Sequence, residues 1–134
     1  LPHFQTALTE NNVPEKIIVL REKIAKADGI IICTPEYVFS IPSGLKNLIE
    51  WCVSTTIFSE KPAGLITASA SGVKGHEELK LIMETIQATF VEETTLLIQG
   101  IKGKVNIEGK ITDQNTRNRL AEFLSAFVNL TTKR

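Results

Sequence analysis

Hydrophobic residues in this chain follow two kinds of pattern. Short continuous apolar runs alternate with longer segments in which an apolar residue recurs every three or four positions. The runs predict buried strands, and the spaced positions predict helices that bury one face. The predicted elements are helices over 14–27, 41–52, 77–90 and 113–130, and strands over 30–33, 63–69 and 94–99. Such alternation is typical of βαβ units, so we expect an α/β fold with a doubly wound parallel sheet in a three-layer α/β/α arrangement.

The stretch Gly29–Trp51 carries the strongest local signals. Its apolar run Ile30–Cys33 is uninterrupted, which predicts a strand covered on both faces. Pro35 ends this strand, and Ser40 is expected to cap the next helix, with Pro42 in its first turn. A short loop therefore lies at the carboxyl end of a parallel strand, where open α/β sheets bind ligands.

A second loop of small residues, Ser69–Gly75, follows the strand at 63–69. Glu77 and Glu78 are expected to begin the next helix, since negative charge suits a helix amino terminus. A glycine-rich loop before a helix can cradle a phosphate, but ordinary strand-to-helix turns use the same residues, so no phosphate is assigned here. The loop does not match G-x-S-x-G, so no nucleophilic serine is expected.

Composition excludes several classes of function. The chain has 134 residues, enough for one domain over 1–134, and its 15 basic residues balance its 15 acidic ones. This balance gives no argument for a nucleic-acid partner or an anionic membrane. No apolar run approaches a membrane span and no signal peptide is visible, so a cytoplasmic protein is expected.

Few side chains suggest catalysis or metal binding. Cys33 and Cys52 fit no metal spacing, and free thiols are favoured over a disulfide. His3 and His76 are isolated and are interpreted as surface or capping residues. Trp51 is interpreted as a packing residue, with a subunit contact as the alternative. We predict no metal site and no catalytic side chain.

The segment TPEYVFSIPSGLKNLIEW, residues 34–51, closely resembles the signature TPEYNGSIPGxLKNAIDW of the NADPH-dependent FMN reductase family. Ser69–Gly75 is similar to that family's SASGGxxGG segment. The resemblance implies a flavodoxin-like fold, bound FMN, and NADPH or NADH as co-substrate in a ping-pong reaction. Quinones, azo compounds, metal oxyanions or free flavin would be the small-molecule electron acceptors. Homodimers or homotetramers are expected.

The same resemblance implies which residues contact the flavin. The expected cofactor-binding residues are Pro35, Glu36, Tyr37, Val38, Phe39 and Ser40 in the first loop, and Ser69, Ala70, Ser71 and Gly72 in the second. Where the family usually has Asn-Gly, this chain has Val38-Phe39, so either the backbone alone holds the flavin or Phe39 covers part of the pocket. Glu36 is expected to pair with a basic residue, with a subunit contact as one place for that pair. Replacing Gly72 with valine is expected to remove flavin without unfolding the chain.

Three strands make a small sheet for this fold, and an apolar strand at 30–33 would form an exposed edge. We therefore expect further sequence before Leu1. The family resemblance implies what it contains, namely an earlier strand–loop–helix–strand unit with the phosphate-binding loop. By that resemblance the chain is the C-terminal three-quarters of a domain with sheet order 2-1-3-4-5, its N-terminal part missing.

Two other classes of function remain open. One is a flavodoxin-like electron carrier, which the neutral charge balance argues against because such carriers tend to be acidic. The other is a flavin-free binding or oligomerisation module, which Val38-Phe39 and the lack of a phosphate loop favour.

Overall fold

The computed structural model describes residues 1–133 and shows a three-stranded parallel sheet. The strands are β1 (Ile30–Thr34), β2 (Ala63–Ser69) and β3 (Thr95–Gln99), in the spatial order β1-β2-β3. The three predicted strands are confirmed to within one residue at each end. Ile32 pairs with Leu65, and Leu65 pairs with Thr95, so the carboxyl ends of all three strands meet at one edge.

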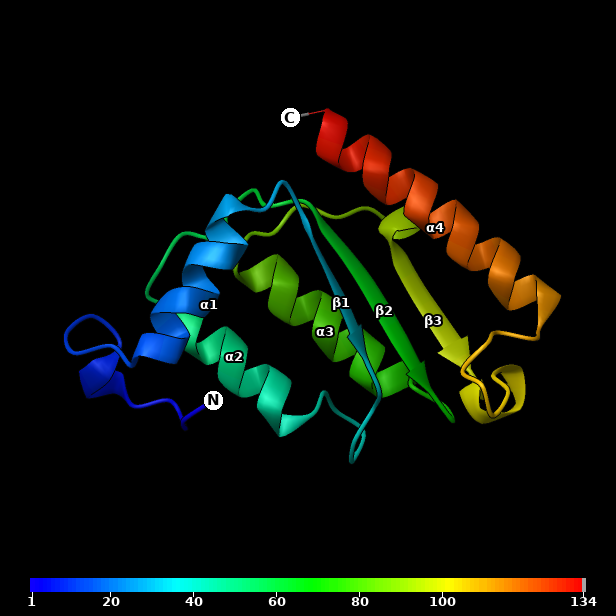
Figure 1. The fold of residues 1–134 in the computed structure, drawn as a ribbon, viewed down its shortest axis with the longest axis horizontal. Helices are drawn as coiled ribbons and strands as arrows, with labels where there is room; N and C mark the ends of the chain where they lie inside the picture. Colours follow the sequence, from blue (N-terminus) through cyan, green and yellow to red (C-terminus); the bar gives the residue numbers. More distant parts are fainter. Residues whose placement is uncertain (134) are drawn as a thin grey trace.

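Helices cover both faces of the sheet, as predicted. Figure 1 shows α1, α2 and α3 on one side of the strands and α4 on the other. Their bounds are Glu15–Lys26 for α1, Ser43–Cys52 for α2, Val73–Thr85 for α3 and Gln114–Thr132 for α4. Short 3₁₀ helices cover Thr6–Leu8, Glu92–Thr94 and Ile101–Lys104. In the described part of the chain, no helix has the length and apolarity needed to cross a membrane.

Each face of β2 has its own apolar core, because successive strand residues point to opposite sides. Leu65 packs with Ile49 of α2 and Leu79 of α3. Ile66 packs instead with strand β3 and with Phe123 of α4. Burial of side chains of this size contributes about 1.5–3 kcal/mol each, which fixes the helices against the sheet.

The expectation that β1 is covered on both faces is wrong. Ile31 is 43% exposed, and Cys33 is also exposed. They pair with Gly64 and Ile66 of β2, so they share the sheet face on which α4 lies. Helix α4 packs against the 3₁₀ helix Glu92–Thr94, β3 and β2, which leaves this face of the edge strand uncovered.

Three of the four helices begin or pack differently from the prediction. Helix α2 begins at Ser43 after Pro42, and no side chain caps it, so Ser40 is not its cap. Helix α3 begins at Val73, four residues before Glu77. Within α4, helical spacing predicts Leu124 in the buried stripe, yet its side chain is exposed.

The sequence predicts Thr112 or Asp113 as the cap of the last helix, and in the structure Asp113 caps α4. Its Oδ2 accepts hydrogen bonds from the amide of Thr116 at 2.9 Å and from the Thr116 hydroxyl at 2.6 Å. These bonds lower the pKa of the Asp113 carboxyl, the hydroxyl contributing more than the amide.

The amino-terminal segment is attached to α2 through Trp51. The Trp51 side chain is fully buried, and its Nε1 donates to the carbonyl of Pro2 at 2.8 Å. Its ring meets that of Phe4 edge to face, with centroids 5.2 Å apart. Trp51 is therefore a packing residue, as the favoured interpretation had it.

Candidate functional site

The two predicted loops lie next to each other at the carboxyl edge of the sheet. Loop A is defined as residues 35–40, after β1, and loop B as residues 69–72, after β2. Because β1 and β2 are parallel neighbours, both loops leave the sheet at the same edge. A direct contact joins them: the amide of Glu36 donates to the Ser69 hydroxyl at 3.3 Å.

The carboxylate of Glu36 makes the main connection between the loops. Its Oε1 accepts from the amide of Gly72 at 3.1 Å, and its Oε2 accepts from the amide of Gly75 at 2.8 Å. These amides belong to the amino terminus of α3, where the helix dipole favours negative charge. Within the described chain, helix amides satisfy the Glu36 carboxylate and no basic side chain does. Pairing with a basic residue across a subunit contact stays a prediction.

Two glycines after β2, Gly72 and Gly75, lie against side chains of the protein itself, so a Cβ at either position would come close to them. Gly72 has a φ of +82°, and a Cβ there would lie 2.9 Å from Leu97 Cδ1. A Cβ on Gly75 would lie 3.1 Å from Cγ of Glu36. The resemblance implies a flavin contact at Gly72, whereas in the structure the side chain of Leu97 lies where a Cβ on Gly72 would be.

Loop A contains a tight two-residue turn. The amide of Tyr37 donates to the carbonyl of Ser40 at 2.9 Å, and the amide of Ser40 returns a bond to Tyr37 at 3.0 Å. Val38 and Phe39 both have left-handed φ values, +51° and +57°. Positive φ at both central residues is type I′ geometry, which favours Asn-Gly and disfavours a β-branched residue.

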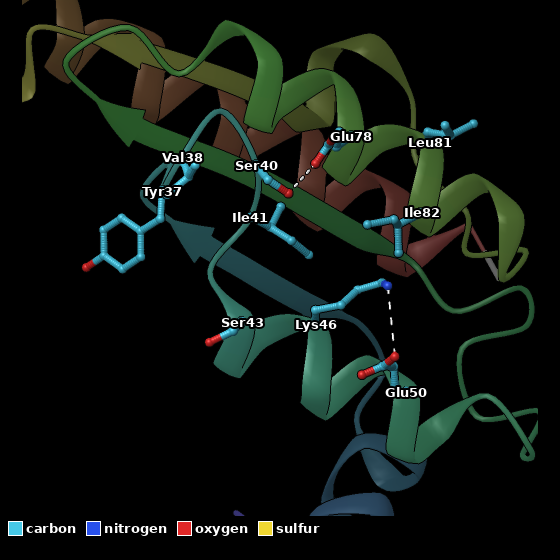
Figure 2. A pocket seen from close by; sticks show the side chains of 10 residues that line it. All are labelled: Tyr37, Val38, Ser40, Ile41, Ser43, Lys46, Glu50, Glu78, Leu81 and Ile82. Carbon is cyan, nitrogen blue, oxygen red and sulfur yellow. Dashed lines mark hydrogen bonds and ion pairs between the residues drawn. The ribbon is translucent and has the colours of Figure 1, made fainter. Parts of the chain in front are cut away.

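The same turn exposes its apolar side chains. Val38 is 95% exposed, Phe39 73% and Tyr37 60%. Beside the turn, loop A, α2 and α3 enclose a groove of about 870 Å³. Its lining residues are Tyr37, Val38, Ser40, Ile41, Ser43, Lys46, Glu50, Glu78, Leu81 and Ile82 (Figure 2).

Polar groups of the groove are already paired with each other. The Ser40 hydroxyl donates to the carboxylate of Glu78, which fixes loop A to α3. Nζ of Lys46 lies 4.0 Å from Oε2 of Glu50, which is one turn further along α2. Figure 2 shows both pairs, with the Tyr37 ring directed away from the groove.

His76 is not the surface or capping residue that the sequence suggested. It is 7% exposed, and its Nδ1 lies 2.7 Å from the Thr67 hydroxyl. Burial lowers the pKa of His76, the positive charge of Lys80 lowers it further, and Glu92 opposes both. The available signal was helical spacing, because His76 precedes the buried Leu79 by three positions and Met83 by seven.

Of the other predicted flavin-binding residues, some have hydrogen-bonding groups that are already paired within the protein and others do not. The carbonyl of Pro35 accepts from the Thr34 hydroxyl at 2.9 Å, and the carbonyl of Ala70 accepts from the amide of Gly100 at 3.0 Å. Ser71 is exposed, and within residues 1–133 its hydroxyl has no hydrogen-bond partner. Free groups at this edge are therefore the Tyr37 ring and the Ser71 hydroxyl.

This set of groups fits part of a flavin. An exposed aromatic ring and a free hydroxyl suit the plane and the polar edge of the isoalloxazine system. They do not suit its phosphate, since Glu36 already occupies the anion-binding amides of α3. Among the described residues, no cluster of three or more His, Cys, Asp or Glu side chains could hold a metal ion.

Comparison with known proteins identifies relatives of this chain. Over 125 residues it is 34% identical to a quinone reductase of Escherichia coli (strain K12), covering 88% of this chain and 66% of the relative. It is 30% identical to the NADH:(hydroxy)cinnamate reductase subunit CrdA of Vibrio ruber, covering 98% of this chain and 67% of that protein. The chain thus spans about two-thirds of the length of these relatives.

A solved structure supports the same relationship. FerB, a flavoenzyme NAD(P)H:(acceptor) oxidoreductase from Paracoccus denitrificans, superposes with a TM-score of 0.77 at 25% identity, covering 99% of this chain and 76% of FerB. The predicted flavodoxin-like α/β fold is confirmed by this likeness. The family model described as NADPH-dependent FMN reductase matches residues 1–102. The chain therefore belongs to the NADPH-dependent FMN reductase family.

Proposed function

We propose that this chain forms the ring-binding part of an NAD(P)H-dependent FMN reductase that delivers electrons to small-molecule acceptors. The observation that carries the proposal is the meeting of loops A and B at the carboxyl edge of β1 and β2, joined by Glu36. This is the position at which open parallel sheets bind ligands. When bound, FMN supplies the hydride chemistry, so the protein needs to supply orientation and hydrogen bonds.

Some residues of the two loops would contact the flavin ring, and others would hold the loop backbones in position. Tyr37 offers an exposed aromatic face, and Ser71 offers a free hydroxyl to a polar edge of the ring. Pro35 and Ser69 hold the loop backbones in place, and Ala70 and Ser71 leave room above loop B because their side chains are short. No side chain of the described loops is assigned to proton transfer.

Quinones are the acceptors we favour among quinones, azo compounds, metal oxyanions and free flavin. The relative from Escherichia coli is a quinone reductase. A flat conjugated acceptor of this kind also suits stacking against the open face of the bound flavin ring.

We further propose that the protein self-associates as a homodimer through the apolar turn. Tyr37, Val38 and Leu81 are exposed beside one groove, and Phe39 is exposed on the same turn. An exposed apolar patch of this kind marks an interaction surface. A second copy fits because the surface offers both an apolar protrusion, the turn, and an apolar groove to receive it. Homotetramers would need a further surface.

FMN titration tests the function directly. Binding is followed by quenching of flavin fluorescence, and turnover by oxidation of NADPH with a benzoquinone acceptor. We expect bound FMN that NADPH reduces, and weaker binding in Tyr37→Ala and Ser71→Ala than in Ser59→Ala, a control on the loop before β2. Bound FMN that NADPH does not reduce would support an electron carrier instead.

A flavin-free binding module is the second candidate. The filled amino terminus of α3 and the apolar turn at Val38-Phe39 favour it. A protein that stays colourless with added FMN, yet forms oligomers, would replace the reductase proposal with this one.

A further inference from the structure

Glu36 connects the two loops through hydrogen bonds that cannot be inferred from the family signature alone. Its two carboxylate oxygens accept from two different amides of the α3 amino terminus, and its own amide donates to Ser69. Glu36 alone therefore makes three hydrogen bonds from loop A to residues 69–75. No other residue of loop A makes as many such bonds among those found in residues 1–133.

The side chain is also held by packing. A Cβ atom placed on Gly75 would lie 3.1 Å from Glu36 Cγ and 3.2 Å from Glu36 Cβ. The aliphatic carbons of Glu36 therefore pack directly against the backbone of α3. Gly72 contributes to the same arrangement, because its left-handed φ of +82° begins the helix at the residue whose amide meets Oε1. The carboxylate therefore has little freedom to turn toward a ligand.

From this geometry we propose that Glu36 is a positioning residue for the flavin, acting through both loops without touching the ring. Its carboxylate fixes the spacing and tilt of loop A relative to loop B, and the ring contacts Tyr37 and Ser71 on either side of that connection. The proposal rests on the function proposed above. It replaces the direct cofactor contact that the sequence comparison implied for Glu36.

The energetics favour a carboxylate at this position. Hydrogen bonds to an ionised acceptor are about twice as strong as neutral ones, and the dipole of α3 adds to them. A glutamine of the same length keeps one acceptor oxygen but turns an NH₂ group toward the second amide. An alanine removes both acceptors and leaves the amides of Gly72 and Gly75 unpaired.

The test compares Glu36→Gln and Glu36→Ala with the unaltered protein. We expect FMN affinity to fall about ten-fold in Glu36→Ala and less in Glu36→Gln, in the order of the acceptors kept. We also expect the visible circular dichroism of bound FMN to change, because the ring sits at a different angle between the loops. A purely structural role would lower the melting temperature and leave this spectrum unchanged.

Asp113→Ala is the matched control. Asp113 also caps a helix with its carboxylate, but it caps α4 on the opposite face of the sheet. It should lower thermal stability while FMN affinity and the flavin spectrum stay as they are. If Glu36→Ala and Asp113→Ala give the same flavin spectrum, the positioning role is wrong.

Amide exchange of the flavin-free protein separates this proposal from the proposed function. We expect slow exchange at the amides of Gly72 and Gly75, and fast exchange at both in Glu36→Ala. Fast exchange at both in the unaltered protein would overturn the connection, whatever the flavin result. If the unaltered protein binds no FMN, the reductase function and this role of Glu36 both fail, while slow exchange would still establish the connection between the loops.

Discussion

The Nδ1 atom of His76 lies 2.7 Å from the Oγ1 atom of Thr67, and both side chains are buried between α3 and β2. The bond joins the first turn of the helix to the strand that carries loop B. It thus fixes the position from which the amino terminus of α3 meets Glu36.

This pair predicts a pH-dependent stability. Burial lowers the pKa of His76 below its ordinary value of 6.5, so the unfolded chain binds the proton more readily than the folded one. The contribution of neutral His76 is fully present above about pH 6.5 and is lost as the pH falls below that value. Urea unfolding at several pH values between about 8 and 5 measures it. His76→Gln should show a smaller loss, and an equal loss in both proteins would contradict the assignment.

Removing the hydroxyl of Thr67 should destabilise the fold without a large change of shape. Thr67→Val leaves Nδ1 of His76 buried without a partner, at an expected cost of about 1–3 kcal/mol in the free energy of unfolding. Thr95→Val, at an exposed hydroxyl bond on β3, is the comparison and should cost less. If urea unfolding shows the same loss of unfolding free energy for both variants, the buried Thr67–His76 bond stabilises the fold no more than the exposed one.

The left-handed turn predicts an unusual pair of effects. Replacing Val38-Phe39 with Asn-Gly suits positive φ at both positions, so the free energy of unfolding should rise by about 1–3 kcal/mol. The same double substitution removes the exposed apolar tip, so self-association should weaken. Thermal unfolding measures the first effect and sedimentation the second. Unchanged sedimentation would remove the turn from the proposed dimer surface.

Gly72 gives a prediction that differs from the one based on sequence. Valine there was expected to remove flavin and spare the fold, but even Gly72→Ala should destabilise the chain by about 1–3 kcal/mol. The φ of +82° disfavours a side chain, and its Cβ would meet Leu97 at 2.9 Å. Gly109→Ala separates the two causes, because Gly109 has a φ of +80° with nothing within 4 Å of its Cβ. Chemical denaturation should show a larger loss for Gly72→Ala.

The two cysteines should differ in reactivity. Cys33 is exposed on β1, whereas Cys52 is buried in α2, where burial raises the pKa of its thiol. Because the thiolate is the reactive form, an aromatic disulfide reagent should label Cys33 in the folded chain and Cys52 only after unfolding. Cys33→Ser should abolish the fast phase of labelling. A fast phase that survives this substitution would place Cys52 closer to solvent than the structure does.

Local sequence patterns determined the elements and the place of the site. The apolar runs at 30–33, 63–69 and 94–99 mark three parallel strands, and Asp113 marks the start of α4, because burial and capping depend on neighbours in the chain. The start of α3 was predicted too late, since backbone amides of Gly72 and Gly75 are capped by a residue from another loop, which no local pattern shows.

The order of strands and helices, the family signature and the two loops after β1 and β2 can all be predicted from local sequence, because each depends on residues close together in the chain. The roles of the polar residues in those loops depend instead on contacts between distant parts of the chain. Glu36 and Gly72 lie 36 positions apart, and Thr67 and His76 lie on different elements. Their hydrogen bonds exist because parallel pairing brings two strand ends to one edge, and spatial proximity of that kind has no periodicity that the sequence could display.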